Sequence, residues 1–195
     1  MAKAGEESGK LHDVERMMCI FMYLDKNQDN LVSREELEQH CNKYKIDKKH
    51  VDAWLKRFDT DRDGKISLAE FCRGLNLPVA EIEEEKKERQ MQETQPPEAQ
   101  PTVEGIKIIS CPMTWVKQEK IMKKFDELAK NASEEQMGKV TEDFQDFLNK
   151  SFGPVWQCVI LTGSYWTRYT HEPFMSIQFF YRQKYIVLAW RSQRT

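Results

Sequence analysis

Two segments of the chain place oxygen-bearing side chains at the same positions of a twelve-residue pattern. The first segment runs from Asp25 to Glu36 and the second from Asp59 to Glu70. The shared positions are the first, third, fifth, ninth and twelfth. They hold Asp25, Asn27, Asp29, Ser33 and Glu36 in the first segment, and Asp59, Asp61, Asp63, Ser67 and Glu70 in the second. Carboxylate, carboxamide and hydroxyl oxygens in such a set are suited to holding a hard cation.

The spacing is that of the EF-hand loop, which binds calcium through six to eight oxygen ligands. Its seventh position supplies a backbone carbonyl, here from Leu31 and from Lys65. The sixth position must turn with a positive φ, which Gly64 does without steric cost. Asn30 stands at that position in the first segment, and asparagine tolerates the left-handed region better than most residues. The sequence therefore predicts two calcium-binding loops.

Helices are expected around each loop. Ser33 with Glu36, and Ser67 with Glu70, form S-x-x-E capping boxes that start a helix. The flanking apolar residues recur at helical spacing and define one face. They are Met17, Phe21 and Leu24 before the first loop, Val51, Trp54, Leu55 and Phe58 before the second, and Phe71 and Leu75 after it. Two acidic solvated turns are the alternative, and the repeated pattern with its helical flanks argues against them.

The two loops are not equivalent in charge. The second has four carboxylates and Gly64, whereas the first has three carboxylates and Asn30. We therefore predict up to two bound Ca²⁺ ions, with tighter binding in the second loop. The pattern does not distinguish a calcium sensor from a calcium buffer.

The composition excludes several classes of protein. The 195 residues carry a formal net charge of −2, so no single-sign field typical of nucleic-acid binding is expected. No apolar run reaches the length of a membrane-spanning helix, and no apolar leader follows Met1. Five cysteines without a C-x-x-C pair indicate reduced thiols in a cytoplasmic protein. Cys158 and His171 lack a third catalytic partner, so core packing is the expected role of this pair. The sequence also has no phosphate loop, nucleophile elbow or pair of catalytic carboxylates, so we do not expect an enzyme.

The chain divides into three zones. Residues 11–78 contain the predicted EF-hand pair. Residues 79–104 form a highly charged, helix-favouring stretch followed by Pro96, Pro97 and Pro101, and we interpret them as a linker. Residues 105–195 form a second domain.

The second domain is predicted to mix helices with strands. A short strand over 105–110 precedes one helix over 114–132 and another that starts at the Ser133–Gln136 capping box. Four strand-like runs follow, at 155–161, 165–171, 176–181 and 185–190. The expected fold class is therefore two domains: an all-α EF-hand pair, then an α+β domain with two helices and an antiparallel sheet.

Several segments of the second domain resemble the cytoplasmic dynein light chain. They are Phe152–Val159, Tyr169–Glu172, Ile177–Tyr181 and Leu188–Ser192. An EF-hand pair joined to such a domain through a charged linker is similar to the tegumental allergen-like calcium-binding proteins of parasitic flatworms. Segments 57–61, 70–74 and 161–167 look especially like that family.

The resemblance implies a homodimer in which the dynein light chain-like domain exchanges one strand. It also implies grooves that take extended partner peptides by adding a strand to the sheet. The exchanging strand would consist of Tyr165, Trp166, Thr167, Arg168, Tyr169, Thr170 and His171. The family further implies a location in the cytoplasm, beneath the tegument surface membrane or on the cytoskeleton. An adaptor of dynein or the cytoskeleton, with calcium binding secondary, is the alternative function.

Overall fold

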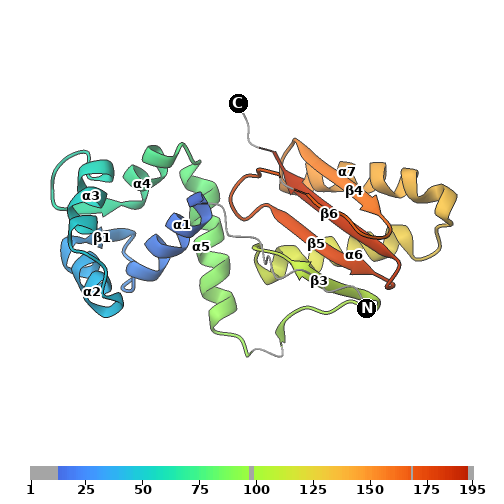
Figure 1. The fold of residues 1–195 in the computed structure, drawn as a ribbon, viewed down its shortest axis with the longest axis horizontal. Coiled ribbons are helices and arrows are strands. Elements are labelled where there is room, and N and C mark those ends of the chain that lie inside the picture. The colour runs from blue at the N-terminus through green and yellow to red at the C-terminus, as the bar shows by residue number, and fades with distance from the viewer. Residues whose placement is uncertain (1–12, 97–98, 168, 193–195) are drawn as a thin grey trace. The chain divides into compact units, whose positions relative to one another are not determined.

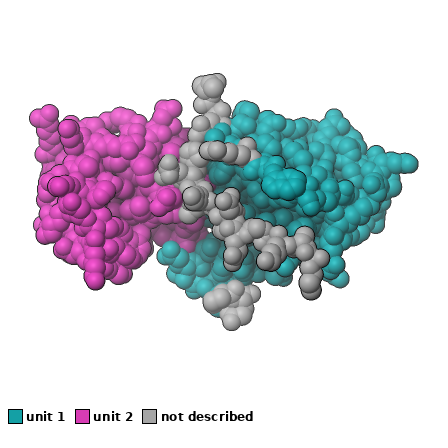
Figure 2. Space-filling view, viewed as in Figure 1, with its two compact units in different colours: residues 1–12, 91–195 teal, residues 13–90 magenta. Residues whose placement is uncertain are grey.

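The computed structural model describes residues 13–96, 99–167 and 169–192. The chain forms two compact units, one of residues 13–90 and the other of the described residues from 91 onward (Figure 2). Leu11 and His12 of the predicted EF-hand zone, and Pro97 of the predicted linker, lie outside the described residues. The units are described one at a time below, as the EF-hand unit and the C-terminal unit.

The EF-hand unit is helical, with one short strand in each predicted loop (Figure 1). Its elements are α1 (Asp13–Leu24), β1 (Leu31–Ser33), α2 (Arg34–Tyr44), α3 (Lys49–Phe58), β2 (Lys65–Ser67), α4 (Leu68–Leu75) and α5 (Val79–Glu93) as far as residue 90. This order confirms the prediction that each loop lies between two helices, α1 and α2 for the first loop and α3 and α4 for the second.

Both predicted capping boxes are present at helix starts. In α2 the Glu36 amide donates to Ser33 Oγ at 3.3 Å, and the Ser33 amide donates to Glu36 Oε2 at 2.9 Å. The Ser67–Glu70 pair repeats this arrangement at the start of α4. Each pair satisfies two backbone N–H groups that a helix start otherwise leaves without partners.

Aromatic rings from separate helices form the core of the EF-hand unit. The Phe71 ring stacks on Phe21 at 4.7 Å and on Trp54 at 5.5 Å, and it packs against Phe58 at 4.6 Å between centroids. These four residues belong to the predicted apolar faces. On α1 the fully buried methionine is Met18, whereas Met17 is only partly buried.

Helix α5 contributes to the EF-hand unit with a mixed stripe of residues. Ile82, Glu85 and Lys86 are buried, although the sequence of this helix is almost entirely polar. The Glu85 carboxylate is paired with the Arg89 guanidinium at 2.7 Å. The stripe therefore buries charges in pairs, a case that apolar periodicity alone does not reveal.

The C-terminal unit combines two long helices with a four-stranded antiparallel sheet. Its elements after α5 are β3 (Ile106–Ser110), α6 (Trp115–Ala129), the 3₁₀ turn η2 (Glu134–Gln136), α7 (Met137–Phe152), β4 (Trp156–Leu161), β5 (Ser176–Tyr181) and β6 (Tyr185–Arg191). The strand order is β3-β5-β6-β4, so β3 and β4 lie at the two edges.

Helices α6 and α7 cover one face of this sheet (Figure 1). The Phe125 ring of α6 meets the rings of Phe144, Phe179 and Tyr181 edge to face, at 5.0–5.2 Å between centroids. Trp156 of β4 is fully buried in the same core. The predicted α+β fold with two helices and an antiparallel sheet is confirmed.

One predicted strand is not formed. The described residues of 165–171 have no regular secondary structure, and Arg168 lies outside the described part of the chain. The run has the aromatic and β-branched residues of a strand, but a strand also requires a hydrogen-bonded neighbour. Within the described residues, every ladder of the sheet is made by β3, β4, β5 and β6. The prediction of four strands after the second helix was therefore wrong for this chain taken singly.

Helices long and apolar enough to cross a membrane are absent from the described residues.

Candidate calcium sites

The two loops are joined back to back by their short strands. β1 and β2 pair in antiparallel register, with Val32 directly opposite Ile66. Both side chains are fully buried, as expected for apolar residues at the eighth loop position. This ladder fixes the two loops against each other, so the ligands predicted in each loop sit on a shared frame.

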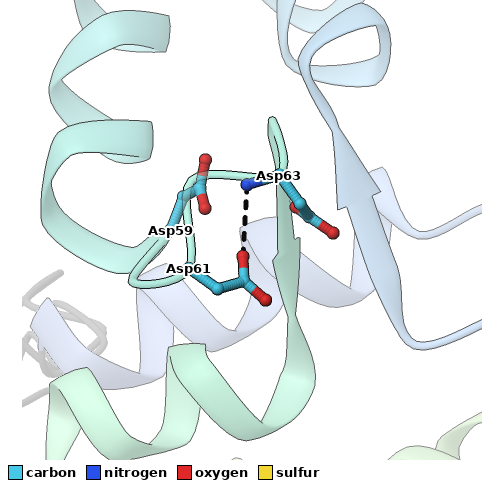
Figure 3. Close-up of side chains that lie close together, drawn as sticks. All are labelled: Asp59, Asp61 and Asp63. Atoms are coloured by element: carbon cyan, nitrogen blue, oxygen red, sulfur yellow. Dashed lines mark hydrogen bonds between the residues drawn. The ribbon is translucent and has the colours of Figure 1, made fainter.

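Three carboxylates converge in the second loop, loop 2 (residues 59–70). One oxygen from each of Asp59, Asp61 and Asp63 lies within 4.8 Å of the others (Figure 3). The Asp63 amide donates to Asp61 Oδ1 at 3.2 Å, and the Gly64 amide donates to Asp59 Oδ2 at 3.1 Å. Gly64 has a φ of 85°, the positive value that its position requires. The sequence prediction for the first, third and fifth positions is therefore matched by their placement.

A carboxylate oxygen that lacks a hydrogen-bond partner indicates that loop 2 fits a cation. Asp59 Oδ1 is buried and has no hydrogen-bond partner among the described residues. A buried carboxylate oxygen without a partner carries an electrostatic cost that a bound cation removes. Oxygen ligands on a flexible loop are the donor set that calcium prefers. Loop 2 therefore fits calcium, and Asp59, Asp61 and Asp63 are the carboxylates that would hold it.

Glu70, the twelfth residue of loop 2, is fixed by hydrogen bonds at both oxygens. Oε1 accepts from the Thr60 hydroxyl at 2.8 Å and from the Thr60 amide at 2.9 Å. Oε2 accepts from the Ser67 hydroxyl at 2.7 Å. Burial, the largest single effect, raises the pKa of Glu70, but the hydrogen bonds from Ser67 and Thr60 together lower it to about 2. The side chain is thus held as an anion close to Asp61, whose amide donates to Oε1 at 3.4 Å, but it is not one of the three converging carboxylates.

The first loop, loop 1 (residues 25–36), has the same backbone frame with different side chains. The Asn30 amide donates to Asp25 Oδ2 at 3.1 Å, as Gly64 does to Asp59. The Asn27 carboxamide nitrogen donates to Asp29 Oδ2 at 2.8 Å. Asn30 has a φ of 63°, so asparagine takes the turn assigned to it from sequence. Asp25 Oδ1 is buried without a hydrogen-bond partner among the described residues, as Asp59 Oδ1 is. Both oxygens of Asp29 accept hydrogen bonds, so loop 1 presents fewer uncommitted anionic oxygens than loop 2.

The seventh and ninth loop positions are the first and last residues of the short strands. Leu31 and Lys65 begin β1 and β2, where their side chains play no part in the predicted coordination. The Ser33 and Ser67 hydroxyls are engaged with Glu36 Oε2 and Glu70 Oε2, at 2.9 and 2.7 Å. A ninth residue occupied in this way acts on the ion through water more readily than directly.

Sequence reasoning missed one residue outside loop 1 that contacts it. The Lys86 ammonium of α5 donates hydrogen bonds to Asp25 Oδ2 and to Asn30 Oδ1, the latter at 2.6 Å. Lys86 lies in a run of glutamates and lysines that is typical of a solvated helix. No local pattern points to this contact, because the two residues are 61 positions apart.

The residues predicted to form the exchanging strand lie beside β5 and β6. The Tyr169 ring stacks on Trp190 at 4.5 Å between centroids, and the Tyr165 hydroxyl donates to Gln178 Oε1 at 3.2 Å. His171 Nδ1 lies 2.8 Å from the Glu172 carbonyl oxygen. Trp166 is 93% exposed, while Thr167 and Thr170 lie in the same irregular segment.

Comparison with known proteins matches both units to families. Residues 14–75 match the EF-hand domain pair, and residues 105–192 match dynein light chain type 1. A tegument antigen of Schistosoma mansoni is 41% identical over 94% of this chain and 96% of its own length. Antigen Sm21.7 of the same species is 36% identical over 92% of this chain and 96% of its own length.

A solved structure is similar to the C-terminal unit. The dynein light chain-like domain of the Fasciola hepatica calcium binding protein FhCaBP2 is 43% identical, with a TM-score of 0.45, over 49% of this chain and 100% of that one. The two schistosome relatives match nearly the whole chain, across both units. The chain therefore belongs to the tegumental allergen-like calcium-binding proteins of parasitic flatworms, in which an EF-hand pair precedes a dynein light chain-like domain.

Proposed function

We propose that this EF-hand protein binds two calcium ions, one in each loop, and that loop 2 binds its ion more tightly. The carboxylate cluster of Asp59, Asp61 and Asp63 carries this proposal. Among the described residues, none of these three carboxylates forms an ion pair with a lysine or arginine. Like charges at this distance repel one another, and a divalent cation reverses that cost. In loop 1 the neutral Asn27 replaces the central aspartate.

Calorimetry on the full chain tests the two sites. Glu36→Gln should abolish one binding event and leave the tighter one, whereas Glu70→Gln should abolish the tighter one. Glu142→Gln, in an exposed ion pair on α7, is the matched control and should leave both events unchanged. Equal losses from the two loop variants, or the larger loss from Glu36→Gln, would refute the proposed order of affinities.

The response to calcium separates a sensor from a buffer. A sensor opens its EF-hand helices and exposes apolar surface when the loops fill. We propose the sensor role, because the core of the EF-hand unit is formed by rings from separate helices, Phe21 on α1, Phe58 on α3 and Phe71 on α4. Binding of an apolar fluorescent dye should increase with calcium in the wild-type chain. No increase at saturating calcium would assign the protein to the buffers.

We also propose that the C-terminal unit forms a homodimer through the free edge of β4. Within the described residues β4 pairs only with β6, which leaves its other edge open. Unpaired edges are templates for another strand. Segment 165–171 supplies strand-forming residues, and its Trp166 is 93% exposed, a costly state for a large aromatic side chain. Exchange of this segment between two copies would cover both features.

Light scattering on the full chain tests dimerisation. The expected mass is twice the 23.2 kDa of one chain. Trp166→Asp should shift the mass toward the monomer, whereas Val116→Asp, at an exposed position of α6, should not. A monomeric wild-type chain at micromolar concentration would contradict the proposal.

The adaptor role is the second candidate, and the open β4 edge supports it because an extended partner peptide could occupy that edge in place of the exchanged segment. Affinity capture from a cytoskeletal extract, with calcium and with chelator, separates the two roles. Recovery of the same motor or cytoskeletal protein under both conditions would favour the adaptor. Recovery only with calcium would favour the sensor.

We propose a non-enzymatic protein of the cytoplasm, beneath the tegument surface. The tegument location is supported by the name of the Schistosoma mansoni tegument antigen. Immunofluorescence on parasite sections tests this directly. Signal confined to tissues below the tegument would contradict it.

A further inference from the structure

A lysine side chain from α5 binds the first and sixth residues of loop 1. The Lys86 ammonium donates hydrogen bonds to Asp25, the first residue of the loop, and to Asn30, the sixth, at 2.6 Å from its Oδ1. The Lys86 side chain is 7% exposed and the Asp25 side chain is 0% exposed. Ion pairs shielded from water in this way interact more strongly than surface pairs.

Loop 2 has no counterpart of this lysine contact. Its sixth residue is Gly64, which has no side-chain oxygen, and Asp59 has no ion-pair partner within the ranges that the structure describes. The backbone frames agree, because Asn30 and Gly64 each donate an amide hydrogen bond of 3.1 Å to the first aspartate of their loop. The Lys86 ammonium is therefore the principal difference between the two loops at the first and sixth positions.

The rest of α5 keeps Lys86 in this position. Ile82 and Glu85 are buried on the same stripe of the helix, and Glu85 is paired with Arg89. The aliphatic stem of Lys86 is buried with them. The ammonium therefore leaves the loop only if its buried stem withdraws, which loosens the contact between α5 and the loop.

We propose that Lys86 is a built-in competitor of calcium in loop 1, and that calcium enters this loop by displacing it. The ammonium pairs with Asp25 Oδ2, which also accepts the Asn30 amide, and so neutralises the first ligand of the loop. Its positive charge opposes a calcium ion at the neighbouring Asp25 Oδ1, which is buried and has no hydrogen-bond partner among the described residues. Lys86 thereby lowers the calcium affinity of loop 1 and couples loop 1 occupancy to the release of α5. The inference rests on the proposed binding of calcium by both loops.

Three variants in a Glu70→Gln background test the competition, because this background leaves loop 1 as the remaining site. Lys86→Met keeps the aliphatic stem and removes the charge, and it should tighten loop 1 by about tenfold to a hundredfold. Asn30→Gly keeps the positive φ and removes one acceptor of the lysine, so it should tighten loop 1 by a smaller factor. Lys87→Met, at an exposed position of the same helix, should leave the affinity unchanged.

The result that overturns the proposal is equal calcium affinity of the Lys86→Met and Lys87→Met chains. Asn30→Gly keeps the test decisive if Lys86→Met fails to fold, because weaker or unchanged binding in that variant also overturns it. The proposed function has a separate readout in Glu36→Gln, which retains loop 2 alone. Loss of calcium binding there would refute calcium binding at loop 2 without involving Lys86.

Hydrogen exchange supplies a readout that does not depend on affinity. Amides of residues 82–90 should exchange faster when calcium fills loop 1 of the Glu70→Gln chain. In the Lys86→Met version of that chain, calcium should change their exchange little, because no ammonium remains to be displaced. Unchanged exchange in the presence of Lys86, at saturating calcium, would contradict the displacement.

Discussion

Val32 and Ile66 lie directly opposite each other on β1 and β2, and both side chains are completely buried. They belong to different calcium loops, so each loop rests on the other through this pair. The relationship makes the two loops one mechanical unit, although their ligand sets are separate. A change in either side chain is therefore expected to affect both loops.

Ile66→Ala tests this dependence. The substitution removes buried methyl groups and should lower the free energy of unfolding by about 2–4 kcal/mol. It should also weaken calcium binding in both loops, including loop 1, whose ligands are untouched. Chemical unfolding and calorimetry provide the two measurements. Val116→Ala, at an exposed position, is the control, and an effect confined to loop 2 would contradict the shared frame.

Gly74→Ala should destabilise the EF-hand unit. A Cβ atom at this position would lie 2.7 Å from Cδ1 of the buried Phe58 ring. The clash should cost about 1–3 kcal/mol, which exceeds the gain of about 0.5–1 kcal/mol from replacing glycine in a helix. Thermal unfolding measures the effect.

Gly138→Ala is the matched control for that substitution. This glycine lies in α7 and has no atom within 4 Å of the added Cβ. The same replacement should therefore stabilise the chain by about 0.5–1 kcal/mol. If the two substitutions changed stability in the same direction, the close contact of Gly74 with Phe58 would not be the determining factor.

Tyr181 should make the C-terminal unit sensitive to alkaline pH. Burial and then the hydrogen bond to Asp126, at 3.0 Å, raise its pKa from 10 to about 12. A raised pKa in the folded state means that the stability from protonated Tyr181 is complete below pH 10. This stability is lost as the pH rises toward about 12.

The measurement compares the wild-type chain with Tyr181→Phe, which has no hydroxyl to titrate. The difference between their free energies of unfolding should stay constant below pH 10 and shrink between pH 10 and pH 12. A difference that does not vary across this interval would show that Tyr181 titrates normally in the folded protein.

Two cysteines should resist alkylation in the folded protein. Burial raises the pKa of Cys158 to about 12, and burial followed by the charge of Glu83 raises the pKa of Cys72 to about 11. Because the thiolate is the reactive form, both should react slowly with iodoacetamide at neutral pH. Peptide mass spectrometry should show rapid labelling of both only after unfolding. Rapid labelling of Cys158 in the native chain would contradict the raised pKa of this partly buried thiol.

The sequence was sufficient wherever the determinants are local. The loop ligands from Asp59 to Glu70 and the Ser67 cap lie within one twelve-residue segment, so their spacing predicts their placement. The helices and strands of the C-terminal unit likewise follow from apolar periodicity, with one exception. Segment 165–171 has strand-forming residues, but its pairing depends on a neighbour that sequence patterns do not supply.

Lys86 shows the same limit in the EF-hand unit. Its helix was interpreted as a solvated linker because the run has few apolar residues. In the structure, Lys86 is buried instead and pairs with Asp25, which lies 61 residues earlier in the chain. Patterns of hydrophobicity do not predict buried ion pairs, because both partners are of residue types normally found at the surface.

One NMR titration tests the central claim that both loops bind calcium with unequal affinity. Gly64 and Asn30 each donate their amide hydrogen to the first aspartate of their own loop, so each amide resonance reports on one site. As calcium is added to the full-length chain, the Gly64 resonance should shift and saturate first. The Asn30 resonance should follow at higher calcium. Shifts in the reverse order, or no shift of either resonance, would contradict the account.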